Sequence, residues 1–127
     1  MTELHNSADI GARIKRALTE DLRESRLSRA DIAIRLSGLA GRTITEHHLD
    51  AFAAESKQGY RFPAELIAAW TEVTGSRRVL DLVCAAAGYH AADETERDLA
   101  ALGRAQIQRE RLDKRLEELK GNLWTRA

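Results

Sequence analysis

Apolar residues recur every three or four positions along most of this chain, and this spacing constrains its fold more than any other feature. The first run is Ile10, Ile14, Leu18 and Leu22, with charged residues between them. Such spacing is typical of an amphipathic helix with one apolar stripe. A single proline and an aromatic content of only 5% leave little material for strands. The sequence therefore predicts an all-α protein.

Cap and turn residues define a second and a third helix. Ser28, with Asp31 three positions later, has the form of a capping box that opens the second helix. Gly38 to Gly41 is expected to end this helix, with Gly41 as the positive-φ residue of a turn. Thr45 is the expected N-cap of the third helix, over residues 46–54. The residues predicted to be buried in this pair are Ile32, Ala33, Leu36, Leu49 and Phe52.

Two more helices follow a polar loop over residues 55–61. Pro63 is expected in the first turn of the fourth helix, and residues 74–76 (Thr-Gly-Ser) separate it from the fifth. Gly88 ends this compact part. The expected inner faces carry Leu66, Ile67, Trp70, Val73, Val79, Leu80, Leu82, Val83 and Ala86, and the single cysteine, Cys84, is expected to be buried and inert.

A sixth, longer helix is predicted over residues 93–120, with Gly121-Asn122 as its C-cap. Its leucines at 112, 116, 119 and 123 have the spacing of a coiled-coil seam, but the seam decays upstream at Arg109. Such leucines require a partner helix or contact with the rest of the chain, and self-association is favoured over folding back. The predicted organisation is a five-helix domain over residues 1–90 and a self-association helix over residues 91–127.

Composition and charge exclude several classes of protein. No stretch approaches the ~18 apolar residues of a membrane span, and the N-terminus lacks a signal-peptide pattern, so the expected location is the cytoplasm. The chain has no phosphate-binding glycine loop, nucleophile elbow or paired carboxylates, so we expect no enzyme activity, cofactor or small-molecule substrate. His47 and His48 project about 100° apart on a helix, which disfavours a shared metal ion.

The distribution of charge favours DNA, although the chain carries 20 basic and 20 acidic residues. Residues 9–42 contain eight basic and five acidic residues, so the positive excess lies near the front. The second and third helices have a small residue, Ala33, where they would cross, which is typical of a helix-turn-helix. With Leu49 and Phe52 pointing inward, the third helix would expose Glu46, His47 and Asp50 to DNA.

The chain from Ser28 to Gly75 resembles the Cro-like phage-repressor helix-turn-helix family. The resemblance is carried by three segments. They are Ser28-Arg29-Ala30-Asp31-Ile32-Ala33, Thr45-Glu46-His47-His48-Leu49-Asp50-Ala51-Phe52 and Lys57-Gln58-Gly59-Tyr60-Arg61-Phe62-Pro63. Together with Thr74-Gly75-Ser76, the run from Phe52 to Pro63 is also similar to small regulators of Mu-like prophages. The turn from Ser37 to Ile44 is longer than is usual in that family.

This resemblance implies which residues would contact DNA. Arg29 would contact a phosphate, Thr45 would cap the recognition helix and meet the backbone, and Lys57 and Arg61 would reach phosphates from the following loop. The full predicted DNA-binding set is Arg29, Arg42, Thr45, Glu46, His47, His48, Asp50, Lys57 and Arg61.

Two hypotheses for the function follow. The first is a sequence-specific DNA-binding transcriptional regulator, encoded by a phage or prophage, that acts as a homodimer or a higher oligomer. The second is a helical protein-interaction adaptor without DNA binding, which is motivated by the neutral total charge and the acidic recognition helix.

Overall fold

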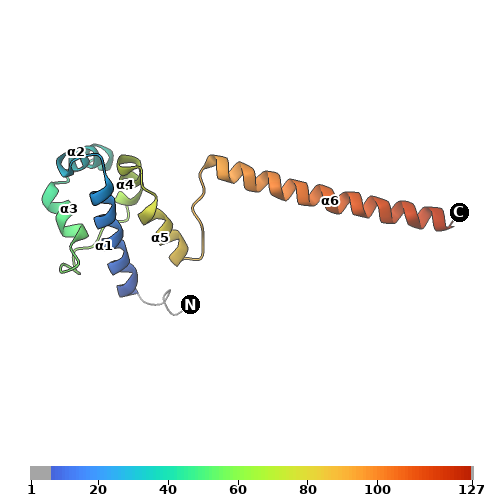
Figure 1. Cartoon of the computed structure of the whole chain (residues 1–127), viewed down its shortest axis with the longest axis horizontal. Coiled ribbons are helices and arrows are strands. Elements are labelled where there is room, and N and C mark those ends of the chain that lie inside the picture. Colours follow the sequence, from blue (N-terminus) through green and yellow to red (C-terminus); the bar gives the residue numbers. More distant parts are fainter. Residues whose placement is uncertain (1–6, 127) are drawn as a thin grey trace. The chain divides into compact units, whose positions relative to one another are not determined.

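The protein is all-α, as predicted. The computed structural model describes the backbone from Ser7 to Arg126, with side chains from Ile10 onward, and no strand occurs in that range. Five helices precede a long sixth one (Figure 1). The helices are α1 (Ser7–Glu24), α2 (Arg29–Ala40), α3 (Glu46–Ala53), α4 (Leu66–Thr74), α5 (Arg78–Ala86) and α6 (Glu94–Arg126).

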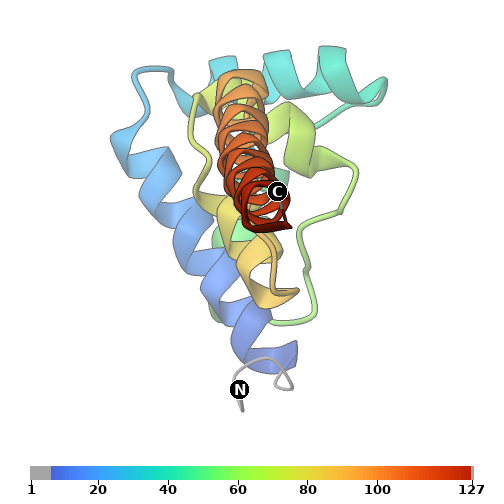
Figure 2. The same ribbon diagram turned by 90° about the vertical axis from the view of Figure 1, so that its right-hand side faces the viewer.

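The contacts within the chain divide it into two compact units, residues 1–91 and residues 92–127. Unit 1 contains α1 to α5, and unit 2 contains α6. In unit 1, α1 packs on α3 and α5, while α2 packs on α3 and α4. In both views α2 lies across the top of unit 1 (Figures 1 and 2). All five helices therefore close around a single core.

The core of unit 1 is built from the apolar faces that the sequence predicts. Trp70 of α4 lies at its centre and is 1% exposed. Phe62 packs edge-on against Trp70 on one side and Phe52 on the other, with ring centroids 5.6 and 5.5 Å apart. The buried cluster consists of Ala17, Leu18, Ile32, Ala33, Leu36, Ile44, Leu49, Phe52, Leu66, Ala69, Trp70 and Val79.

Two predicted helix boundaries are confirmed and one is wrong by a turn. The Ser28 side chain accepts a hydrogen bond from the Asp31 amide, and Gly41 ends α2 with a φ of 68°. Pro63, in contrast, precedes α4 instead of lying in its first turn. Its carbonyl accepts a hydrogen bond from the Leu66 amide, so residues 64–65 form a separate turn that leads into the helix.

The prediction that Cys84 is buried is wrong, because this side chain in α5 is only partly covered. Most other residues of the predicted inner face of α5 are also less buried than expected. Val79 is fully buried, whereas Leu80, Leu82 and Val83 are half-buried. The core of unit 1 therefore covers the first turn of α5 most completely.

The predicted end of the last helix at Gly121-Asn122 is also wrong. α6 continues to Arg126, and the Thr125 hydroxyl donates to the Gly121 carbonyl at 2.8 Å. Glycine within a helix costs only about 1 kcal/mol relative to alanine, so it need not end one. At the other end, a carboxylate oxygen of Asp93 accepts from the Glu96 amide at 2.8 Å and caps the helix. Between Glu94 and Arg126 no side chain is buried.

Candidate nucleic-acid interface

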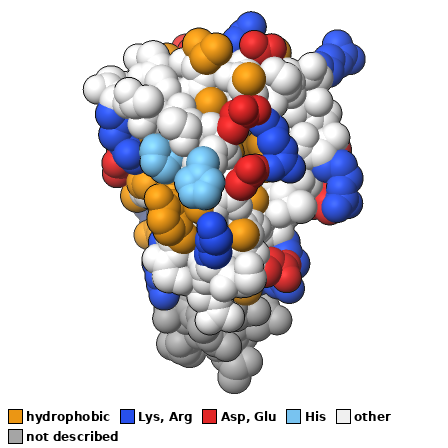
Figure 3. Space-filling view, turned by 90° about the vertical axis from the view of Figure 1, so that its left-hand side faces the viewer, with side chains coloured by type: hydrophobic (Ala, Val, Ile, Leu, Met, Phe, Trp, Pro, Cys, Tyr) orange, Lys and Arg blue, Asp and Glu red, His pale blue; other side chains and the backbone are white. Residues whose placement is uncertain are grey.

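The outward face of α3 is polar. Leu49 and Phe52 point into the core, as predicted, and this leaves Glu46, His47 and Asp50 exposed. Figure 3 shows the side of the molecule on which α3 lies in Figure 1, with histidine, acidic and basic side chains close together on it. The three side chains predicted to face a DNA groove are therefore accessible on one short helix.

Thr45 and His48 form a reciprocal cap at the start of α3. The Thr45 hydroxyl accepts from the His48 amide at 3.2 Å, and the His48 Nδ1 accepts from the Thr45 amide at 3.0 Å. Because Nδ1 accepts, the proton of the neutral ring lies on Nε2. The His48 ring also stacks on Phe52, with centroids 6.3 Å apart. The sequence predicts the Thr45 cap but misses the role of His48, which fills the position that Glu or Gln usually holds.

Two arginines of the predicted DNA-binding set form ion pairs within the chain. Arg29 at the start of α2 pairs with Asp50 of α3. Arg42, in the turn between these helices, pairs with Glu65 at 3.5 Å. All four side chains are exposed, so water screens both pairs and each stabilises the fold by less than about 1 kcal/mol. The first pair nevertheless offsets the negative charge of Asp50 on the face of α3.

Lys57 and Arg61 lie in the loop that follows α3, and both are exposed. Two hydrogen-bonded turns shape this loop. The Lys57 amide donates to the Ala54 carbonyl at 3.1 Å, and the Tyr60 amide donates to the Lys57 carbonyl at 2.9 Å. Thr45 begins α3 and these two cations follow its end. The predicted DNA-contacting residues thus extend along the whole of α3. Arg42 is an exception, because it forms an ion pair with Glu65.

Lys15 of α1 holds the end of α3 in place. Its ammonium group donates to the carbonyls of Ala51 at 3.2 Å, Phe52 at 2.9 Å and Tyr60 at 2.7 Å. The residue is only 5% exposed. Burial lowers the pKa of Lys15, and the nearby charge of Arg61 lowers it further. A cation at these carbonyls also matches the negative end of the α3 dipole.

Because it is buried, Lys15 does not belong to the positive surface charge predicted for residues 9–42. Lys15 is one of the eight basic residues counted over residues 9–42, yet its ammonium lies inside the fold. It is therefore not available to a phosphate. No local pattern marks it, because its three carbonyl partners lie 36 to 45 residues further along the chain.

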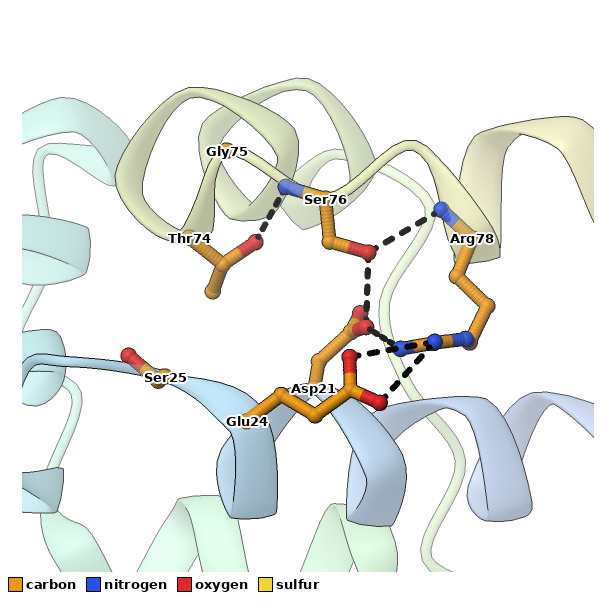
Figure 4. Close-up of a pocket in the computed structure, with 7 residues that line it drawn as sticks. All are labelled: Asp21, Glu24, Ser25, Thr74, Gly75, Ser76 and Arg78. Atoms are coloured by element: carbon orange, nitrogen blue, oxygen red, sulfur yellow. Dashed lines mark hydrogen bonds and ion pairs between the residues drawn. The ribbon is translucent and has the colours of Figure 1, made fainter.

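A second polar cluster, also missed by the sequence reasoning, joins α1 to α4 and α5 (Figure 4). Asp21 is 2% exposed and accepts three hydrogen bonds, from the Trp70 indole at 2.8 Å, the Ser76 hydroxyl at 2.6 Å and the Arg78 guanidinium at 2.6 Å. Arg78 also pairs with Glu24 at 3.1 Å. These bonds to Asp21 and Glu24 raise the pKa of Arg78.

This cluster lines a shallow polar pocket together with Ser25, Thr74 and Gly75. Its polar groups bond to one another, and Figure 4 shows Arg78 reaching from the start of α5 to both carboxylates of α1. The arrangement serves to hold α5 and the end of α4 against α1. α1, to which the cluster joins these elements, also packs on α3.

Over residues 7–126, no group of three histidine, cysteine or carboxylate side chains is arranged to hold a metal ion. In the same part of the chain, no helix is both long and apolar enough to cross a membrane. No protein-family model, curated protein or solved structure matches this chain.

Proposed function

We propose that unit 1 binds double-stranded DNA by placing α3 in the major groove, and that the chain is a cytoplasmic transcriptional regulator of the phage or prophage type. The observation that carries the proposal is the way α3 is presented. A reciprocal cap fixes its start, Lys15 fixes its end, and its outward face bears Glu46, His47 and Asp50. A short, rigid helix with a polar outward face is what major-groove recognition requires.

The side chains on this face suit base recognition by a small set of contacts. His47 can donate to or accept from base edges, and a carboxylate can accept from the amino group of cytosine. Glu46 and Asp50 would also repel phosphates, so they would disfavour a wrongly placed helix. Specificity would therefore come from this face, and affinity from the cations around it.

Lys57 and Arg61 are the best candidates for phosphate contacts, since both are exposed beside the end of α3. Arg29 can add a third contact if it leaves Asp50 when DNA arrives. Because the Arg29–Asp50 pair is exposed, separating it costs less than about 1 kcal/mol. Phosphate contacts of this kind make binding strongly dependent on salt.

The decisive experiment is selection from a pool of random duplex DNA with the full chain. We expect a defined sequence to be enriched, and His47→Ala to change or broaden that sequence. An unchanged selected sequence would show that His47 reads no base. Selection that enriches nothing would overturn the proposal.

A charge-matched pair of variants tests the phosphate contacts on the selected duplex. Arg61→Ala should weaken binding and reduce the slope of log affinity against log salt by about 1, because one phosphate contact is lost. The control is Arg104→Ala, which removes an equally charged, exposed side chain from α6. Equal losses from both variants would indicate only a general effect of net charge.

One observation favours the adaptor as a second candidate. Ile34 and Leu39 of α2 are 69% and 51% exposed, and both are large apolar side chains that a protein partner could cover. An adaptor would enrich no DNA sequence, and its binding to a protein partner would weaken on Ile34→Ser. The same selection experiment therefore separates the two functions.

A further inference from the structure

The apolar side of α6 is a block of four leucines that has no cover within its own unit. These residues are Leu112, Leu116, Leu119 and Leu123, and each is between 42% and 65% exposed. Their spacing of four, three and four residues corresponds to successive d, a, d and a positions of a heptad repeat. This spacing reads the same in both directions, so the block can pair with itself in either a parallel or an antiparallel arrangement.

The charge of Arg109 disfavours a parallel pair along the whole length of the helix. It occupies the next a position before Leu112. In a parallel pair it would lie opposite Arg109 of the second copy, between the layers of Ala105 and Leu112. Two like charges inside an apolar seam are costly. An antiparallel pair restricted to the leucine block places Arg109 at the end of the seam, opposite Arg126 of the second copy. Both long side chains can reach water there, so the two charges are not enclosed between apolar layers.

The charges beside the seam distinguish the two orientations in the same way. The flanking e positions hold Asp113 and Lys120, and the g positions hold Arg115 and Asn122. In a parallel pair each g residue faces the e residue five positions later in the partner, so Arg115 would face Lys120 of the second copy, twice per dimer.

An antiparallel pair joins e to e and g to g. With Leu116 opposite Leu119 of the second copy, Asp113 faces Lys120 of that copy on one side of the seam. Arg115 then faces the neutral Asn122 on the other side. At the e and g positions, the parallel pair thus contains two repulsive contacts, and the antiparallel pair contains two attractive ones.

We infer that α6 binds α6 of a second copy in an antiparallel pair, centred on the leucine block over residues 112–123. This inference deepens the self-association that the leucine spacing predicts, and it does not depend on whether unit 1 binds DNA. Arg115 and Lys120 each pair with a glutamate of their own helix, but both pairs are exposed and weak. Lys120 lies 3.9 Å from Glu117 and remains 64% exposed, so it can turn to a second carboxylate.

A charge reversal at Lys120 tests the orientation, because the two arrangements predict opposite signs. Lys120→Glu places two acids face to face in the antiparallel pair and should weaken association about threefold to tenfold. In a parallel pair the same change creates an attraction to Arg115 and strengthens association. Adding Asp113→Lys to Lys120→Glu should restore the antiparallel pair. Association would be measured by sedimentation of the full chain without DNA.

The matched control is Lys114→Glu, which makes the same change of charge at the f position, on the side of α6 away from the leucines. It should leave association unchanged. Stronger association of the Lys120→Glu variant, or a wild-type chain that remains monomeric at every concentration reached, would overturn the inference. Because DNA is absent, neither outcome bears on base recognition.

Distances between spin labels give a second, independent readout. Cysteines would be placed at Thr95 or Thr125 in a Cys84→Ala background and labelled separately. At a rise of 1.5 Å per residue, the antiparallel pair places the two labels at 95 about 70 Å apart and those at 125 about 25 Å apart. A parallel pair would bring both sets within about 15 Å and would overturn the inference.

Discussion

Unit 1 and α6 consist of the same secondary structure, yet their helices are maintained in different ways. The five short helices of unit 1 surround a cluster of buried apolar residues and share two buried charged groups, Lys15 and Asp21. α6 has 33 residues and buries none of them. The comparison shows that one part of the chain is shaped by contacts distant in sequence, and the other by contacts within a turn or two.

Local effects account for α6. Asp93 caps its start, Glu94 and Glu96 lie in its first turn, and Arg126 lies in its last, all of which match the helix dipole. Pairs such as Arg115–Glu118, at 3.3 Å, add a few tenths of a kcal/mol each. At this length a helix can persist without tertiary contacts. The short helices of unit 1 cannot, so their contacts should be far more sensitive to substitution.

The largest effect is expected at Asp21. Asp21→Asn removes the charge that Arg78 pairs with and leaves one acceptor oxygen in place of two, so the free energy of unfolding should fall by about 3 kcal/mol. Urea denaturation would be followed by Trp70 fluorescence in a Trp124→Phe background. Asp31→Asn, at an exposed carboxylate of α2, is the control and should change stability little. Equal effects from the two variants would refute a structural role for Asp21.

A slightly smaller effect is expected at Lys15. Lys15→Met keeps the length of the side chain but leaves the carbonyls of Ala51, Phe52 and Tyr60 without their donor, and should cost about 2 kcal/mol. The neighbouring Arg16→Met, on the exposed side of α1, serves as the control. Hydrogen exchange should quicken most at the end of α3, and uniform quickening across unit 1 would argue against a local role.

In α6 a substitution should change assembly and leave unit 1 intact. Leu116 and Ile107 are 52% and 51% exposed but lie on opposite sides of the helix. Leu116→Gln should weaken self-association tenfold or more, a change of about 1.4 kcal/mol or above, while Ile107→Gln should not. The unfolding midpoint reported by Trp70 should stay the same for both. A shift of that midpoint would mean that the two units depend on each other.

The smallest effect is expected at Gly121, where an added methyl group meets no atom within 4 Å. Gly121→Ala should stabilise the last turns of α6 by about 0.5–1 kcal/mol, because alanine loses less backbone entropy on entering a helix. Slower amide exchange after residue 121 would be the readout. Faster exchange there would show that the helix ends near Gly121 in solution, as the sequence predicts.

The sequence predicts what depends on periodicity and on single local signals. The stripes of α1 to α4, the Ser28 and Thr45 caps and the turn at Gly41 are all of this kind. It does not predict the burial of Lys15 or Asp21, because lysine and aspartate are usually exposed and the partners of these two lie far along the chain. His48 was missed because histidine is an unusual residue for closing a capping box.

If unit 1 binds DNA as proposed, the length of α6 bears on how far apart two DNA sites can lie. If α6 pairs antiparallel over its leucine block, the N-terminal ends of the two helices are separated by about 70 Å. B-DNA completes a turn in about 34–36 Å, so this separation corresponds to about two turns. In the proposed regulator, the length of the paired helices would then set the scale of operator spacing, at about 20 base pairs between half-sites.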